Sequence, residues 1–285
     1  MHPKGGTDAE RLASGDHRSK SAEEVAIERA WREKLIQSAT AEDFGKAYDE
    51  LHALFLEEQG EGAEIYGSVN PRHQDRARQV ILRKVESGHR VLEVGCGEGE
   101  TSRMLAQQGN SVVSIDVSSV ALQAARDQID GQSWDLQYEH GDARDLRFPD
   151  ASFDFVVSEH FVEHISMADM LTHLAQVHRV LKPGGSYLIL TPSRLWNGRR
   201  SVGFHLNVYT LEELCAIVRR CGFRPTWLET RFLRRFNFVL ESDGLLLRSA
   251  FLWERMLHAV RIYQWPLAVR GRVLPTVMVC ATKEQ

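Results

Sequence analysis

The sequence predicts a doubly wound α/β fold, in which a seven-stranded, mostly parallel sheet carries helices on both faces. Three observations lead to this prediction. From residue 90 onward, short apolar runs that suit buried strands alternate with segments of helical periodicity. A glycine-rich turn at residues 95–99 follows the first apolar run, and an acidic residue, Asp116, ends the second. Alternating strands and helices form a parallel sheet through right-handed crossovers, with ligands at the carboxyl ends of the strands.

The segment that precedes the sheet is predicted to form a helical cap. Residues 1–20 contain almost no large apolar side chains, so we expect a mobile tail there. Within residues 21–88, apolar side chains recur at helical spacing, and a capping-box signature begins at Ser21. The second helix places Phe44 and Tyr48 on its apolar face. Three helices are expected: the first begins at residue 21, the second covers about residues 41–56 and the third about residues 76–85.

The sheet itself is expected within residues 89–285. Its strands are predicted at residues 90–94, 111–115, 134–139, 153–158, 186–191, 224–230 and 273–281. Helices are predicted near residues 100–108, 118–128, 167–181 and 210–221. Between the last two strands, residues 232–270 are too long for a hairpin turn, so we predict an apolar helical insertion there.

Composition excludes several classes of protein. Of 285 residues, 43% are hydrophobic and 26% are charged, which is typical of a globular chain. A formal net charge of -4 lacks the basic balance of a nucleic-acid-binding protein. The four cysteines contain no CxxC pair, which argues against a zinc site or a disulfide framework. No apolar run approaches the ~20 residues of a membrane span, and the polar first residues do not resemble a signal peptide, so we expect a cytoplasmic protein.

The glycine-rich turn indicates a ligand that contains a ribose. Glycines at this point let the backbone turn sharply and approach a ligand without a Cβ in the way. No Lys-Ser or Lys-Thr pair follows residues 95–99, and the third glycine comes too early for a dinucleotide fingerprint, so a pyrophosphate is disfavoured. At the end of the second strand, Asp116 is placed to accept hydrogen bonds from a ribose diol.

Further motifs follow the other strands of the predicted sheet. They are His140-Gly-Asp-Ala143, Ser158-Glu159, Glu163-His164 and Leu181-Lys-Pro-Gly-Gly185. As a set over residues 90–222, these motifs resemble the class I S-adenosylmethionine-dependent methyltransferases, particularly the subgroup with a Glu-His pair after strand 4 and Leu-Lys-Pro-Gly-Gly before strand 5. The resemblance implies a Rossmann-like methyltransferase fold, with S-adenosylmethionine as cofactor and S-adenosylhomocysteine as product.

The resemblance also implies roles for single residues. The expected cofactor-binding set is Glu93, Gly95, Cys96, Gly97, Gly99, Asp116, Val117, Asp142, Ala143, Ser158 and Glu159. The glycine turn would hold the methionine part, with the Glu93 carboxylate organising the turn and the cofactor amine. Asp116 would hold the ribose hydroxyls, and Val117 would lie beside the adenine. Asp142 would accept from the adenine amine while the Ala143 amide meets a ring nitrogen, and the end of the fourth strand would offer carbonyls to the ammonium.

Three histidines are candidates for the catalytic base. Methyl transfer from a sulfonium is an in-line displacement, which needs alignment and, for a hydroxyl acceptor, removal of a proton. Histidine suits this role because its ordinary pKa lies near neutrality. His160 and His164 follow the fourth strand, and His205 lies in the loop after the fifth. A supporting position beneath the site is the alternative for His164.

The same stretch leaves a metal site open. His160, Glu163 and His164 also match the spacing of a metalloprotease motif, which the absence of a long helix and of a further ligand excludes. Some related methyltransferases hold a divalent ion through Glu-x-x-Glu-His, but His160 stands at the first position here. His160, Glu163 and His164 could converge with His205 on an ion softer than magnesium. Because spacing alone does not show convergence, no residue is assigned as a metal ligand.

Two segments bear on the acceptor. The loop after the fifth strand contains Arg194, Arg199, Arg200, Trp196, Phe204 and Tyr209. Its arginines would suit an anionic acceptor, and a solvated basic loop is the alternative. The apolar insertion at residues 232–270 is expected to pack into the core, while a lid over a lipid-like acceptor, a dimer face and a peripheral membrane contact stay open.

These observations together predict an O-methyltransferase. We expect methyl transfer to a hydroxyl of a natural-product, lipid or saccharide intermediate, in a monomer or a homodimer without nucleic acid. A nicotinamide-dependent reductase is one alternative, which the glycine spacing and the lack of a Tyr-x-x-x-Lys pair disfavour. A non-catalytic scaffold that keeps the cofactor fold is the other.

Overall fold

The computed structural model gives the arrangement of most of the chain. It describes residues 22–38, 40–58, 71–194, 205–233, 236–241, 251–252, 254–257, 259–260 and 276–284. The tail expected at residues 1–20, the capping box at Ser21 and four aromatic or basic residues of the acceptor loop (Trp196, Arg199, Arg200 and Phe204) lie outside the described residues.

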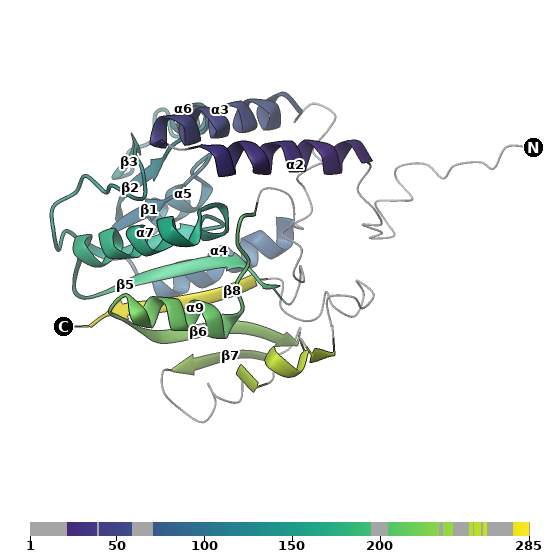
Figure 1. Cartoon of the computed structure of the whole chain (residues 1–285). Coiled ribbons are helices and arrows are strands. Elements are labelled where there is room, and N and C mark those ends of the chain that lie inside the picture. The colour runs from purple at the N-terminus through teal and green to yellow at the C-terminus, as the bar shows by residue number, and fades with distance from the viewer. Residues whose placement is uncertain are drawn as a thin grey trace, which may run out of the picture.

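One mixed sheet, in the order β3-β2-β1-β4-β5-β8-β6-β7, organises the described chain (Figure 1). The strands are β1 Arg90–Val94, β2 Ser111–Asp116, β3 Leu136–His140, β4 Phe153–Glu159, β5 Leu181–Pro192, β6 Phe223–Leu233, β7 Phe236–Glu241 and β8 Thr276–Lys283. Strands β1 to β5 pair in parallel, whereas β8 is antiparallel to both β5 and β6. The predicted doubly wound, mostly parallel fold is confirmed, and every one of its seven expected strands is present.

An eighth strand corrects the prediction of a helical insertion. β7 lies within the segment 232–270 and pairs antiparallel with β6. Its sequence, Phe-Asn-Phe-Val-Leu-Glu, is rich in residues that favour strands, and pairing satisfies backbone groups that an open edge of β6 would leave exposed. Further along, residues 251–252 and 254–257 are helical as expected.

Helices cover both faces of the sheet. They are α2 Ala22–Gln37, α3 Ala41–Glu58, α4 Pro71–Lys84, α5 Glu100–Gln107, α6 Ser119–Asp127, α7 Met167–Val180 and α9 Leu211–Arg220, with a short 3-10 helix η1 at Val162–His164. In Figure 1, α7 and α9 lie in front of the sheet and α4 lies behind it. Side chains that accept from free backbone amides fix three helix starts: Ser118, Ser166 and Thr210. In the part of the chain that the structure describes, no helix has the length and hydropathy of a membrane span.

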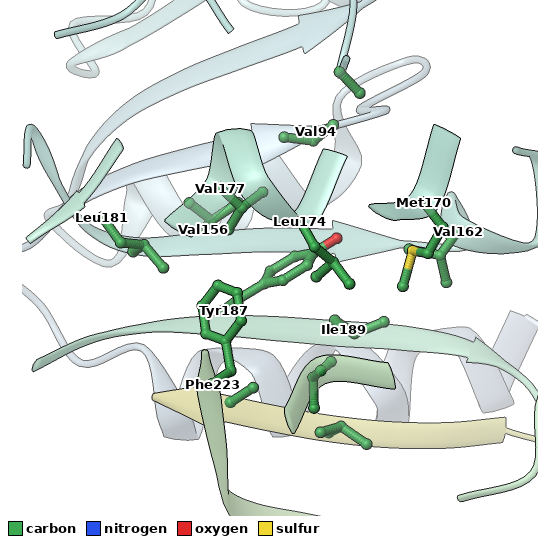
Figure 2. Close-up of a cluster of buried hydrophobic side chains, with 14 of the residues drawn as sticks. Val94, Val156, Val162, Met170, Leu174, Val177, Leu181, Tyr187, Ile189 and Phe223 are labelled. Carbon is green, nitrogen blue, oxygen red and sulfur yellow. The ribbon is translucent and has the colours of Figure 1, made fainter. Parts of the chain in front are cut away.

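Strand β5 shows how the sheet separates two cores. Tyr187 and Ile189 point into the cluster beneath α7 and α9, which Figure 2 shows together with Leu174. The alternating residues Leu188 and Leu190 join the cluster on the opposite face. A strand that is apolar on both sides in this way belongs at the centre of a doubly covered sheet. The two cores hold the parallel strands in register, so their carboxyl ends form one edge.

Candidate functional site

The parallel pairing brings the predicted motifs together at one edge of the sheet. Val94 of β1 pairs with Ile115 of β2, and Asp116 pairs with His140 of β3. On the other side of β1, Glu93 pairs with Val157 of β4. The segments that follow β1, β2, β3 and β4 therefore leave the sheet side by side.

The glycine turn is folded tightly against its neighbours. Gly95, with φ 71°, donates its amide to the Ile115 carbonyl at 2.9 Å. A Cβ on Gly95 would lie 2.6 Å from the Phe161 ring, and a Cβ on Gly99 would lie 2.1 Å from the Tyr138 hydroxyl. Both positions therefore exclude any larger residue, because the φ angles are positive and no space remains.

Asp116 ties the turn to the start of α6. Its Oδ2 accepts from the Gly97 amide at 2.8 Å, and its Oδ1 accepts from the Ser118 amide at 2.9 Å. The carboxylate is buried, yet each oxygen keeps a second lone pair. A ribose diol that reached this point would find an acceptor already fixed in orientation.

Glu93 lies beneath the turn. Its side chain is 2% exposed, and its Oε2 accepts from the Ser102 hydroxyl at the start of α5. Burial raises the pKa of Glu93 to about 8, so the group is mostly protonated at neutral pH. Cys96 is also buried, and burial raises the pKa of its thiol. Neither side chain offers a free charge, which suits a role in shaping the turn.

Glu159 connects the end of β4 to the helices behind the sheet. Its Oε2 accepts from Arg78 of α4 at 3.1 Å and from the Thr101 hydroxyl. Arg78 also pairs with Glu100 at 2.5 Å. The Oε1 of Glu159 is buried and has no hydrogen-bond partner among the described residues. A buried acceptor of this kind indicates a missing donor, such as a ligand ammonium. Arg78 was not predicted as a site residue, because an arginine in an amphipathic helix looks like any other solvent-facing charge in the sequence.

Asp142 is held by its neighbour. Arg144 donates to the Asp142 carboxylate through its amide at 2.8 Å and through two guanidinium nitrogens, and it also reaches Asp169 at 3.3 Å. Partial burial acts to raise the pKa of Asp142, but the Arg144 hydrogen bonds outweigh it and hold the pKa below its ordinary value. The acid expected to meet an adenine amine is therefore ionised and fixed in orientation.

Three of the four candidate metal or base residues converge at the other end of this edge. The ligand atoms of Glu163, His164 and His205 all lie within 4.8 Å of one another. The Glu163 carbonyl accepts from the Leu206 amide at 2.7 Å, which holds the loop of His205 against η1. The rings of His164 and His205 meet edge-on, with their centroids 5.1 Å apart.

His160 has a different position from the other two histidines. Its Nδ1 lies 3.2 Å from Glu163 Oε1, while the second carboxylate oxygen accepts from the Thr191 hydroxyl at 3.0 Å. Burial acts to raise the pKa of Glu163, but the hydrogen bond with His160 and the neighbouring histidines lower it to about 2. His160 therefore supports the Glu163 carboxylate and is absent from the group of converging ligand atoms.

Helix α3 adds a residue that the sequence placed only on an apolar face. The Tyr48 ring meets the His164 ring edge-on at 6.1 Å. Burial raises the pKa of Tyr48, and the charges of Asp116 and Glu163 act in the same direction. Asp49 docks the helix by accepting from Ser118 Oγ at 2.8 Å.

The described start of the loop after β5 contains one of the three arginines considered for the acceptor, Arg194. Arg194 donates to the Val208 carbonyl at 2.9 Å and forms an ion pair with Glu213 of α9. These two contacts anchor the loop to α9. Tyr209 is buried beside it.

The described part of the insertion packs on the same side. Glu254 is 5% exposed and accepts from the Leu211 amide at 2.8 Å and the Glu212 amide at 3.2 Å, so it caps the start of α9. Leu257 is buried, whereas Met256 is exposed. One face of this segment therefore packs into the fold, as expected.

Comparisons with known proteins agree with this geometry. Residues 92–189 match the family model described as a methyltransferase domain. The chain is 29% identical over 166 residues to a probable S-adenosylmethionine-dependent methyltransferase of Mycolicibacterium smegmatis, with 56% of this chain and 62% of that protein covered. It is 35% identical over 108 residues to the ubiquinone biosynthesis O-methyltransferase of Ruegeria pomeroyi, with 38% and 43% covered.

The first three curated relatives are matched over 43 to 62% of their own length. A solved S-adenosylmethionine dependent methyltransferase from Mesorhizobium loti shares the fold with a TM-score of 0.51 and 21% identity, over 73% of this chain and 96% of that one. At this identity the likeness concerns the fold alone.

Proposed function

Because the chain belongs to the class I S-adenosylmethionine-dependent methyltransferases, we propose that it transfers a methyl group from S-adenosylmethionine to a hydroxyl of a small molecule. The observation that carries the choice of oxygen is the convergence of His164 and His205 on the buried Glu163. Imidazole is a suitable base for a hydroxyl, and it needs a group that stabilises the resulting cation.

The cofactor would lie along the edge from Asp142 to Glu159. Bound there, it supplies a methyl group on a positively charged sulfur. The unpartnered Oε1 of Glu159 supports an ammonium at one end, and the ionised, fixed Asp142 supports an exocyclic amine at the other. Asp116 lies between them with its remaining lone pairs available to ribose hydroxyls.

The base would act from the loop after β5. In this proposal His205 accepts the proton of the acceptor hydroxyl as the new bond to carbon forms, with His164 as its neighbour. Glu163 would stabilise the imidazolium, because its carboxylate is buried and its low pKa keeps it ionised. The Tyr48 ring, which meets His164 edge-on, would border the acceptor. An imidazole base contributes about 10² to 10⁴ in rate when it is well placed.

A divalent cation is a second proposal for the same three residues. Two imidazole nitrogens and one carboxylate within 4.8 Å form a donor set that favours an ion softer than magnesium. We expect chelation to abolish turnover and one of Zn²⁺, Mn²⁺ or Co²⁺ to restore it. Calorimetric titration with each ion gives a readout that is independent of activity, and His205→Ala should lose the binding. Turnover indifferent to chelator, together with no heat of binding, would leave only the histidine base.

For the acceptor class, we propose a neutral phenol or enol of moderate size. The pairing of Arg194 with Glu213 removes one argument for an anionic acceptor, and the aromatic ring of Tyr48 borders the histidines. The similarity to a ubiquinone biosynthesis O-methyltransferase supports catechols as the first probes.

The first experiment is calorimetric titration with S-adenosylmethionine, S-adenosylhomocysteine, NADH and NADPH. We expect micromolar binding of the two sulfur nucleosides alone. Binding of a dinucleotide alone would support the reductase instead, and binding without turnover on any acceptor would support a scaffold. A screen with a radiolabelled methyl donor and catechol probes follows, in which the label should appear on oxygen.

A further inference from the structure

A buried chain of polar groups runs beneath the cofactor edge, from α7 to the sheet. His173 of α7 is 0% exposed. Its Nδ1 lies 3.0 Å from the Ala143 carbonyl, and its Nε2 lies 2.8 Å from the Tyr187 hydroxyl. The same hydroxyl lies 2.8 Å from Ser158 Oγ. Figure 2 shows Tyr187 reaching from β5 to the α7 residue Leu174, so the chain crosses the apolar layer.

The partners determine the direction of each hydrogen bond. A carbonyl only accepts, so Nδ1 of His173 carries a hydrogen that it donates to Ala143. Burial lowers the pKa of His173 to about 4, which keeps the ring neutral and leaves Nε2 as an acceptor. Tyr187 must then donate to Nε2, and its oxygen accepts from the Ser158 hydroxyl. The direction of all three hydrogen bonds in the network is therefore determined.

This hydrogen-bonded network fixes the peptide that carries the adenine end of the site. The peptide between Ala143 and Arg144 is held at both ends, because its carbonyl accepts from His173 and its amide donates to Asp142 Oδ1 at 2.8 Å. Arg144 then grips the Asp142 carboxylate with its guanidinium. The orientation of Asp142 therefore depends on a residue that lies 31 positions further along the chain.

The same ring also supports the glycine turn. The Phe161 ring meets the His173 ring edge-on at 5.2 Å. Phe161 in turn fills the space beside Gly95, where a Cβ would approach its ring to 2.6 Å. Thus His173 supports the segments after β1 and β3 at the same time, and it reaches the end of β4 through Tyr187.

We propose that His173 is a positioning residue, which selects adenine by fixing the Ala143–Arg144 peptide and, through it, the Asp142 carboxylate. This inference rests on the proposed function, because it assumes that the adenosine part of the cofactor lies at Asp142. His173 touches no reacting atom. Its contribution is to the choice of nucleobase, and the base step at His205 is separate from it.

Two substitutions separate the halves of the network. The amide nitrogen of an asparagine overlaps the position of Nδ1, so His173→Asn keeps the donor to Ala143. His173→Gln places its amide near Nε2 and loses that donor. The matched control is His178→Gln, on the same helix and against Phe223, outside the network. Thermal melting of each variant identifies any that fails to fold.

The readout is the ratio of dissociation constants for S-adenosylhomocysteine and its inosine counterpart, which carries a carbonyl in place of the exocyclic amine. Each ratio is measured on one sample, so a partial loss of folded protein does not change it. We expect His173→Gln to reduce the preference for adenine at least tenfold, while His173→Asn and His178→Gln retain it. Equal ratios in all proteins would overturn the inference and leave the proposed function intact. A wild-type protein that binds neither nucleoside would overturn both.

A second measurement needs no ligand. Nitrogen-15 spectra of the free protein should show His173 as the neutral Nδ1–H form from pH 5 to pH 8. The Arg144 amide resonance should move in His173→Gln and stay in place in His173→Asn. A ring that is protonated at pH 6, or that carries its hydrogen on Nε2, would contradict the inference directly.

Discussion

Asp116 combines two tasks in one buried carboxylate. It holds the amides of Gly97 and Ser118, and these contacts keep the glycine turn beside the start of α6. The remaining lone pairs would serve the ribose. A substitution at this position therefore removes both a structural contact and a proposed ligand contact, and the measurements must distinguish the two.

We predict that Asp116→Ala weakens binding of S-adenosylhomocysteine at least tenfold, equivalent to about 1.4 kcal/mol. The reason is the loss of an acceptor that is already oriented. Asp116→Asn keeps one carbonyl oxygen and should have an intermediate affinity. Titration calorimetry gives the constants, with the exposed Asp130→Ala as the control. Affinity unchanged in Asp116→Ala would remove the ribose assignment.

In the proposed mechanism His205 accepts the proton of the acceptor, so its loss should leave cofactor binding largely unaffected. We predict that His205→Ala lowers kcat by about 10² to 10⁴ while changing the affinity for S-adenosylhomocysteine less than about threefold. Single-turnover rates with the catechol identified in the screen provide the measurement. The control is His178→Ala, a histidine of α7 that packs against Phe223 outside the proposed site. Wild-type turnover in His205→Ala would exclude it as the base.

At the scale of elements, a carboxylate from a distant segment caps the N-terminus of a helix in two places. Asp49 of α3 accepts from Ser118 Oγ and from the Val120 amide at the start of α6. Glu254 of the insertion accepts from two amides at the start of α9. The free backbone amides at each helix start donate to the carboxyl oxygens, so these contacts attach the flanking segments to the sheet domain.

Docking of α3 gives a prediction about an element. Asp49→Ala should lower the free energy of unfolding by about 0.5–2 kcal/mol, the usual effect of losing a helix cap. It should also weaken S-adenosylhomocysteine binding, because the same helix packs so closely on the segment after β2 that a Cβ added to Gly45 would lie 3.0 Å from the Val117 carbonyl. Urea denaturation and calorimetry measure the two effects. The control is the neighbouring Glu50→Ala, whose exposed ion pair with Lys34 should contribute less than about 1 kcal/mol.

The Glu254 cap gives a prediction about pH. Burial raises the pKa of Glu254 from 4.5 to about 7, although the two amides oppose it. The folded state therefore binds more protons, so its stability contribution is present below pH 4.5 and is lost as the pH rises through about 7. Glu254→Gln, which does not titrate, should show a shallower loss of stability between pH 5 and pH 8.

The free energy of unfolding of the wild type should fall with pH more steeply than that of Glu254→Gln, by at most about 1.4 kcal/mol per pH unit. Urea denaturation at several pH values measures it, and Glu93 and His173 titrate equally in both proteins, so the difference isolates Glu254. Parallel curves for wild type and Glu254→Gln would contradict the raised pKa.

At the scale of the whole molecule, the site is assembled from segments far apart in the sequence. Arg78 of α4 reaches Glu159, Tyr48 of α3 meets His164, and the loop of His205 hydrogen-bonds to η1. The sheet brings together the segments of the proposed cofactor edge. The flanking helices contact both this edge, through Arg78, and the cluster of Glu163, His164 and His205, through Tyr48.

The sheet and the motifs along its carboxyl edge could be predicted from the sequence. The strands are recognisable because apolar residues on both faces must be buried, and parallel pairing then brings their carboxyl ends together. The turn at Gly95 and the acid at Asp116 are local features, so their positions follow from neighbouring residues. β7 was not predicted, because its short apolar run lies in a longer segment of helical pattern. Nothing in the sequence indicated that the edge of β6 pairs with another strand.

Which side chains meet could be seen only in the folded chain. His173, Tyr48 and Arg78 lie on helical faces whose sequence pattern is compatible with ordinary packing. Arg194 carries the same charge whether it pairs with Glu213 or faces an acceptor. These contacts depend on how α3, α4, α7 and α9 pack on the sheet. Burial and hydrogen-bond partners are properties of the packed chain, so no sequence pattern indicates them.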